Sequence, residues 1–151
     1  MFKRIIILST VTLLAACAHK PFVAQSNDFD NYFAHQVIRS NTSLVIHAEH
    51  GQITSTNEPY KSVNSACTEQ AFSGKSFLFG GHKISDPEIL NQMSDDYGFT
   101  VFQAVMGKRI KPHMSIFNDK SVINKVSKII DLDKLRVECI KSKGWDYAAN
   151  K

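Results

Sequence analysis

The residues best suited to chemistry by type and spacing are the two histidines of His47-Ala48-Glu49-His50. Histidines three positions apart on a helix share one face and can bind one metal ion such as Zn²⁺. The surrounding residues instead predict a β-hairpin, and on a strand His47 and Glu49 face one side while His50 faces the other. We therefore interpret them as surface residues at a hairpin edge, and we predict no metal site and no cofactor.

Three other groups of residues contain types found in functional sites, but none has the spacing or length that such a site needs. Gly80-Gly81-His82-Lys83 lacks the length and the serine or threonine of a P-loop, so it predicts a turn. Asp95 and Asp96 are adjacent, whereas glycosidase carboxylates face each other across about 5 to 10 Å. The basic cluster Lys108–Lys111 is interpreted as a solvated turn that could also contact lipid A phosphates or an acidic partner. The sequence therefore predicts no catalytic residue.

The first residues of the chain have the composition of a secretory signal peptide. Lys3 and Arg4 precede a ten-residue apolar run, Ile5–Leu14, which is followed by two alanines. A basic start, a short apolar region and small residues are typical of such peptides. The run is about half as long as the roughly 20 residues that a membrane-spanning helix needs. This segment therefore predicts export.

The residues that close this segment, Leu14-Ala15-Ala16-Cys17, resemble the lipobox of bacterial lipoproteins. The resemblance implies that residues 1–16 are a signal peptide, that the chain is cut before Cys17, and that the Cys17 thiol is the lipid attachment site. Ala18 follows, rather than an aspartate, which by analogy with enterobacterial sorting implies the outer membrane. The expected mature protein has a lipidated tether over residues 17–27 and a single globular periplasmic domain over residues 28–151.

Loss of the signal segment changes the charge and the cysteine count. The formal net charge falls by two from +4, so the basic isoelectric point does not indicate nucleic-acid binding. With Cys17 assigned to lipid, Cys67 and Cys139 remain, and two cysteines in an oxidising compartment are typical of a disulfide. The alternative, a nucleophilic thiol, has no C-x-x-C context or nearby basic cluster to activate it.

Local patterns predict the elements that hold these groups. Helical spacing covers Asp28–Arg39, capped by Asn27 or Asp28, then Ser62–Phe72 with Cys67 facing inward, and Pro87 to about Asp95 after an Asp86 N-cap. Apolar and β-branched runs predict strands over Ser43–Ala48, Gln52–Thr56 and Ser76–Phe79. Phe99–Met106 is apolar throughout; we expect a buried strand because glycines bracket it, with a buried helix as the alternative.

The C-terminal third predicts a long helix that begins at Asp119 and that Asp131 could restart or kink. Gly144 has the position of a left-handed residue after the helix, which would fold Trp145 back onto Ile140. The stretch Cys139–Trp145, with the pattern Cys-x-x-x-Lys-Gly-Trp, is similar to the C-terminal signature of small uncharacterised bacterial lipoproteins. Those proteins usually carry an earlier partner cysteine on a helix, so the resemblance supports the pair Cys67 and Cys139 and implies no activity.

Together these observations predict a small α+β domain whose long C-terminal helix is disulfide-linked to an internal helix; a mostly helical fold is the alternative. The expected function is that of a lipoprotein anchored in the outer membrane by its lipid, facing the periplasm, with a non-catalytic binding or accessory role in an envelope assembly. The alternative is an immunity or inhibitor lipoprotein that neutralises a toxic periplasmic hydrolase. Both imply a protein partner in the periplasm and no nucleic acid.

Overall fold

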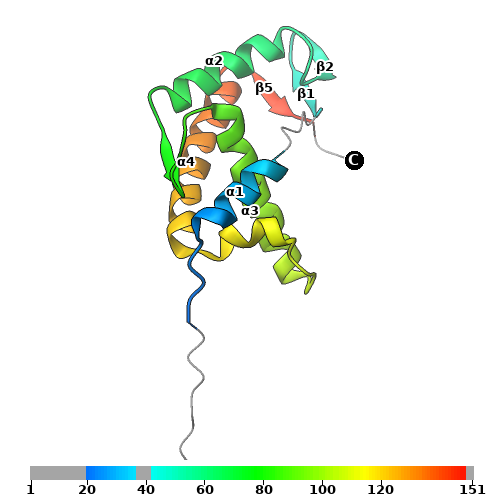
Figure 1. Ribbon diagram of the computed structural model, residues 1–151. Coiled ribbons are helices and arrows are strands. Elements are labelled where there is room, and N and C mark those ends of the chain that lie inside the picture. Colours follow the sequence, from blue (N-terminus) through cyan, green and yellow to red (C-terminus); the bar gives the residue numbers. More distant parts are fainter. Residues whose placement is uncertain (1–19, 37–41, 149–151) are drawn as a thin grey trace, which may run out of the picture.

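The computed structural model describes residues 20–36 and 42–148, so residues 1–16, which we expect to be a signal peptide, and Cys17 lie outside the described residues. The chain forms a small α+β domain (Figure 1). Its elements in order are α1 Ser26–His35, β1 Leu44–His47, β2 Gly51–Thr54, α2 Tyr60–Phe72, β3 Phe77–Phe79, β4 His82–Ile84, α3 Pro87–Val105, the 3₁₀ helix η1 Pro112–Asn118, α4 Lys120–Ser142 and β5 Trp145–Tyr147.

Helix α4 runs along the domain, and the main core lies between it, α1, α3 and η1. Asp119 caps α4, since its Oδ1 accepts hydrogen bonds from the backbone N–H groups of Ser121 (2.6 Å) and Val122 (3.3 Å). The fully buried side chains of this core come from α1, β3, α3, η1 and α4 and include Tyr32, Phe79, Leu90, Met93, Ile116, Val126 and Ile129. Asp131 does not interrupt the helix, because its carboxylate lies at the surface and binds Lys134 at 2.9 Å.

A second, smaller core joins the hairpin to the ends of α2 and α4. Strand order is β2-β1-β5, all antiparallel, and His47 of β1 pairs with Trp145 of β5. The buried residues here are Val45, Tyr60, Cys67, Ile140 and Trp145. Gly144 has a φ of +84°, and its N–H donates to the Lys141 carbonyl at 2.9 Å. Trp145 and Ile140 belong to the same buried cluster, and Trp145 also begins a strand that local patterns did not predict.

The prediction of a strand over Phe99–Met106 is wrong, as is the end of the preceding helix near Asp95. Helix α3 continues through Gly98 to Val105. Gly98 is exposed, where a glycine costs a helix only about 1 kcal/mol, and buried contacts on both sides of it outweigh that cost. The helix ends at Gly107 (φ +63°) in a Schellman motif, in which Lys108 N–H donates to the Gln103 carbonyl at 2.9 Å.

The remaining predicted elements are found with shifted boundaries. Helix α1 begins at Ser26, before the expected cap, because Asp28 Oδ2 accepts the N–H of Gln25 at 2.8 Å and closes the first turn. Two residues assigned to the tether therefore belong to this helix. The β1–β2 hairpin, the helix that carries Cys67, strand β3 and the Asp86 cap of α3 are confirmed.

Candidate functional site

The last two turns of α3 and the turn that follows them expose an apolar and basic surface. The apolar side chains are 44 to 79% exposed: Phe99, Val101, Phe102, Val105 and Met106. The adjoining exposed cations are Lys108, Arg109 and Lys111. We refer to these eight side chains as the α3-end surface. Scattered exposed apolar residues are normal on a protein surface, whereas a contiguous group of this kind indicates an interaction site.

The exposure follows from where α3 leaves the core. The helix buries Leu90, Met93, Asp96 and Thr100 against its neighbours, and the helical residues after Thr100 project beyond them. The sequence predicted burial because Phe99–Met106 is apolar almost without a break. The signal that could have located this surface is the continuation of the 3.6-residue pattern of α3 past Gly98, which leaves six of the eight residues 99–106 exposed.

The basic turn is held against α3. Ile110 is half-buried and packs against the main core. The returning chain and the helix enclose a small cavity of about 70 Å³ between Phe99, Gln103, Ile110 and Met114. The three cations are therefore presented beside the apolar side chains on a fixed turn. They also lie at the C-terminal end of a helix, where positive charge is favourable.

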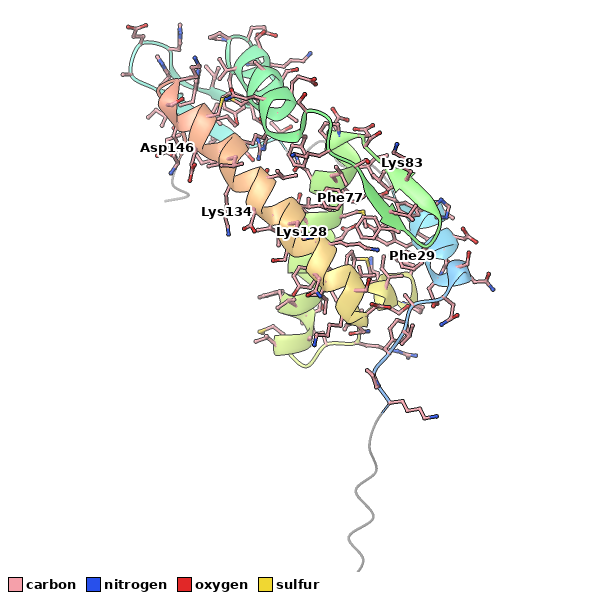
Figure 2. All side chains as sticks on the ribbon, turned by 90° about the vertical axis from the view of Figure 1, so that its left-hand side faces the viewer. Phe29, Phe77, Lys83, Lys128, Lys134 and Asp146 are labelled. Atoms are coloured by element: carbon pink, nitrogen blue, oxygen red, sulfur yellow. A yellow bond between two sulfur atoms is a disulfide. The ribbon has the colours of Figure 1, made fainter. Side chains whose placement is uncertain are left out.

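The α3-end surface lies at the same end of the molecule as the N-terminal segment. In Figures 1 and 2 the chain leaves α1 toward residue 20 at the lower end, and the end of α3 projects there in both views. The backbone N–H of Ala24 donates to Asp119 Oδ2 at 2.8 Å, which fixes the direction of this segment at the start of α4. The β1–β2 hairpin lies at the opposite end (Figure 1).

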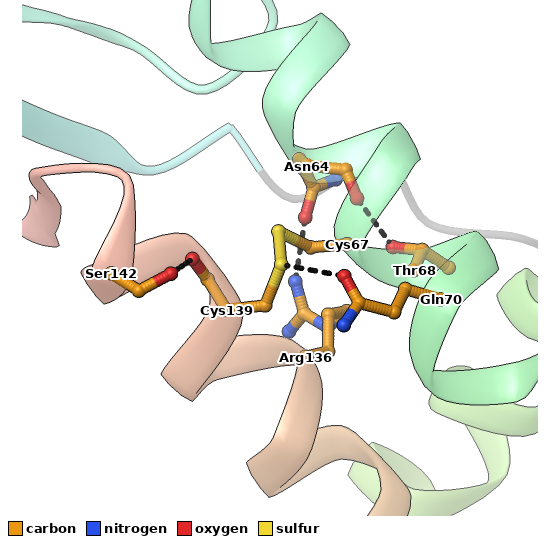
Figure 3. The surroundings of a disulfide bond; sticks show 7 residues. All are labelled: Asn64, Cys67, Thr68, Gln70, Arg136, Cys139 and Ser142. Atoms are coloured by element: carbon orange, nitrogen blue, oxygen red, sulfur yellow. Dashed lines mark hydrogen bonds between the residues drawn. A yellow bond between two sulfur atoms is a disulfide. The ribbon is translucent and has the colours of Figure 1, made fainter.

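The expected disulfide is confirmed. Cys67 of α2 and Cys139 of α4 are bonded, with Cα atoms 5.6 Å apart (Figure 3). Beside it, Arg136 Nη1 donates to Asn64 Oδ1 at 2.7 Å, so a hydrogen bond joins the same two helices. Because both sulfurs are used in the bond, neither cysteine is a free thiol nucleophile in this structure.

A polar groove of about 740 Å³ lies between the residues that flank the hairpin, α2, α3 and α4. Its central cation is paired, since Arg136 Nε donates to Asp133 at 2.6 Å in addition to its bond with Asn64. Burial raises the pKa of Tyr60 above its ordinary value of 10.0, and a hydrogen bond with Tyr147 adds to this, so the Tyr60 hydroxyl keeps its proton above pH 10.0. These polar groups bind one another and link α2 to α4 and to β5.

The two aspartates and the glycine turn have structural roles. Asp96 is buried and accepts hydrogen bonds from the Tyr32 hydroxyl and from Gln92, both at 3.0 Å, whereas Asp95 is exposed. They therefore do not form a carboxylate pair. At the turn, Gly80 has a φ of +55°, and a Cβ there would overlap the Phe29 ring, so this glycine permits the close packing of β3 on α1.

The orientation expected for the histidine group is wrong. Strand β1 ends at His47, and residues 48–50 form a turn, so strand alternation does not apply. One potential ligand atom from each of His47, Glu49 and His50 lies within 4.8 Å of the others. The histidine of Gly80-Gly81-His82-Lys83 behaves differently, because His82 Nε2 lies 2.7 Å from Oδ1 of Asp30, a residue 52 positions earlier in the chain.

Comparison with protein-family models, curated proteins and solved structures finds no match. Within residues 20–36 and 42–148, no helix combines the length and apolar character needed to cross a bilayer. The functional proposal therefore rests on the surfaces of this chain and on its N-terminal sequence.

Proposed function

We propose that this protein is a lipid-anchored lipoprotein of the bacterial outer membrane with a non-catalytic binding role, and that its domain rests against the membrane through the α3-end surface. The observation that carries the proposal is the position of that surface. An apolar patch with a basic margin lies at the end of the domain from which the N-terminal segment departs (Figures 1 and 2).

The occupant that fits this surface is a phospholipid surface with anionic headgroups. Full burial of a valine, methionine or phenylalanine side chain contributes about 1.5 to 3 kcal/mol, and these side chains are still about half exposed. A lysine or arginine near an anionic membrane adds about 1 kcal/mol. Apolar side chains beside cations are the usual combination in interfacial membrane contacts.

Anchoring and surface contact would act together. One acyl chain alone binds a membrane only marginally, and stable attachment takes a second signal. A lipid on Cys17 would lie seven residues before Ala24, whose N–H is bound to Asp119, so an extended tether would reach at most about 25 Å and keep the domain near the bilayer. The hairpin end would then face the periplasm, the side from which a protein partner approaches.

Two measurements test the anchor and the surface separately. For the anchor, intact mass of the mature N-terminus and membrane fractionation of Cys17→Ser are measured. The proposal predicts a lipidated cysteine and a variant lost from the membrane fraction. An unmodified N-terminus at another residue would contradict the anchor, as would a Cys17→Ser variant that stays membrane-bound when Lys108 and Arg109 are also replaced with glutamine.

For the surface, an environment-sensitive fluorophore is attached at Val105→Cys, with Gln52→Cys on the hairpin as the matched control. The lipidated full chain is reconstituted into vesicles of phosphatidylethanolamine and phosphatidylglycerol. We expect a blue shift at position 105 and none at position 52, reduced when Lys108 and Arg109 are replaced with glutamine. If the label at position 105 shows no blue shift while the protein is anchored, membrane contact is refuted. A blue shift that occurs only when a second envelope protein is added also refutes it.

A further inference from the structure

The turn between β1 and β2 gathers three side chains of metal-binding type at the end of the domain opposite the α3-end surface. His47 ends β1, and Glu49 and His50 lie in the turn that leads to Gly51. Their potential ligand atoms lie within 4.8 Å of one another, and Glu49 and His50 are exposed. Small movements of exposed side chains are enough to bring such atoms onto one ion.

The hydrogen bonds of His47 determine which of its ring nitrogens carries the hydrogen. The backbone N–H of Glu49 donates to His47 Nδ1 at 3.1 Å, and His47 Nε2 lies 3.2 Å from the Lys143 carbonyl oxygen. A backbone N–H can only donate and a carbonyl can only accept, so the neutral tautomer that satisfies both bonds carries its hydrogen on Nε2. Its lone pair is on Nδ1, which faces the turn.

This is the arrangement found behind metal-bound histidines. A ligating imidazole almost always donates its other N–H to a carboxylate, a backbone carbonyl or water, which fixes the ring and increases its basicity. Here the acceptor is the carbonyl of Lys143, the residue that ends α4. A metal ion at Nδ1 would release the N–H of Glu49, which is exposed and can bind water instead.

The imidazole rings of His47 and His50 both pack against the indole of Trp145. His50 stacks on Trp145 with ring centroids 5.6 Å apart and planes 10° from parallel. His47 lies 4.8 Å from the same indole and 4.8 Å from the ring of His50. Trp145 is only 2% exposed and packs edge-on against Tyr60. Because the indole of Trp145 is buried, the two imidazole rings that pack against it lose little further conformational freedom when they bind an ion.

We propose that His47, Glu49 and His50 form a surface site for a divalent first-row transition-metal ion. Two imidazoles and one carboxylate suit Cu²⁺ and Zn²⁺ rather than Mg²⁺ or Ca²⁺, which prefer oxygen ligands. The exposed side of the turn leaves the remaining coordination positions to water. The site is independent of the lipid anchor, since it lies at the other end of the domain (Figure 1).

The chain contains a single tryptophan, and its position makes binding measurable. Trp145 lies within 6 Å of both imidazole rings by ring centroid, so Cu²⁺ bound at the site quenches its fluorescence. The full chain in detergent is titrated with CuCl₂. We expect saturable quenching at one ion per chain, reversed by excess ZnCl₂ and not by MgCl₂.

The variants are His50→Gln and Glu49→Gln, with His82→Gln as the matched control because His82 also lies beside a carboxylate, that of Asp30. We expect at least a tenfold loss of apparent Cu²⁺ affinity for His50→Gln, a smaller loss for Glu49→Gln and no change for His82→Gln. Circular dichroism of each variant checks that the fold is retained. Linear, unsaturable quenching, unchanged affinity in His50→Gln, or an equal loss in His82→Gln would overturn the proposal.

Discussion

Replacing Gly144 with alanine tests how closely the end of α4 approaches the hairpin. Gly144 is the first residue after the end-cap of α4 and has a φ of +84°. A Cβ at this position would lie 2.6 Å from His47 Nε2, the atom that faces the Lys143 carbonyl. Alanine therefore has two costs, one from the left-handed backbone and one from displacement of the imidazole.

The magnitudes of these two costs can be separated with Gly74. Gly74 occupies the same position after α2, with a φ of +66°, and a Cβ there would meet no atom within 4 Å. The left-handed backbone alone costs a residue with a Cβ about 1 to 2 kcal/mol. Losing the hydrogen bond of His47 costs about 1 kcal/mol more. We expect Gly74→Ala to lower the free energy of unfolding by about 1 to 2 kcal/mol and Gly144→Ala by about 2 to 3 kcal/mol.

The assay is equilibrium unfolding of the full chain in urea, monitored by circular dichroism. Unfolding by urea allows the free energies of both variants to be compared at one temperature. Combining Gly144→Ala with His47→Ala completes a double-mutant cycle. In the His47→Ala background, the cost of Gly144→Ala should fall to that of Gly74→Ala. Equal costs for the two glycine variants in the wild-type background, or no coupling between Gly144 and His47, would refute the close approach.

Two further predictions concern the bonds that join α2 to α4 and to β5. Replacing Cys67 and Cys139 with alanine should lower the free energy of unfolding by about 4 kcal/mol, because the disulfide closes a long loop with a sequence separation of 72; an unchanged urea midpoint contradicts this. Burial and Tyr147 raise the pKa of Tyr60, so the folded chain keeps a proton that the unfolded chain releases above its ordinary pKa of 10.0. Stability should therefore decline as the pH rises above that value, and less steeply in Tyr60→Phe, whereas equal declines count against the buried hydroxyl.

Much of the helix and hairpin pattern was readable from the sequence because its signals are local. The start of the last helix near Asp119, its apolar stripe and Gly144 at its end each depend on a few neighbouring residues, and all are found in the structure. The same holds for the Asp86 cap and the β1–β2 hairpin. The disulfide was expected from the cysteine count and lipoprotein resemblance, and the structure confirms it.

The error at Phe99–Met106 has a physical cause. An apolar run between two glycines fits a buried strand and a helix equally well, because its residues are apolar on every face. What decided the matter was the contact of α3 with α4 and η1, which continues past Gly98 and then ends. The α3-end surface exists because the helix is longer than the core that it packs against, and no local pattern records the length of the core.

The sequence by itself determined the helix caps, the glycine turns, the cysteine pair and the expectation of a lipid on Cys17, since these depend on neighbouring residues or on the cysteine count. Only the tertiary structure decided which side chains meet. His47 and Lys143 are 96 residues apart, and the gathering of the turn on Trp145 depends on β5 pairing with β1. Such contacts arise when the whole chain minimises its exposed apolar surface, so they follow from the packing of all the elements together rather than from any one segment.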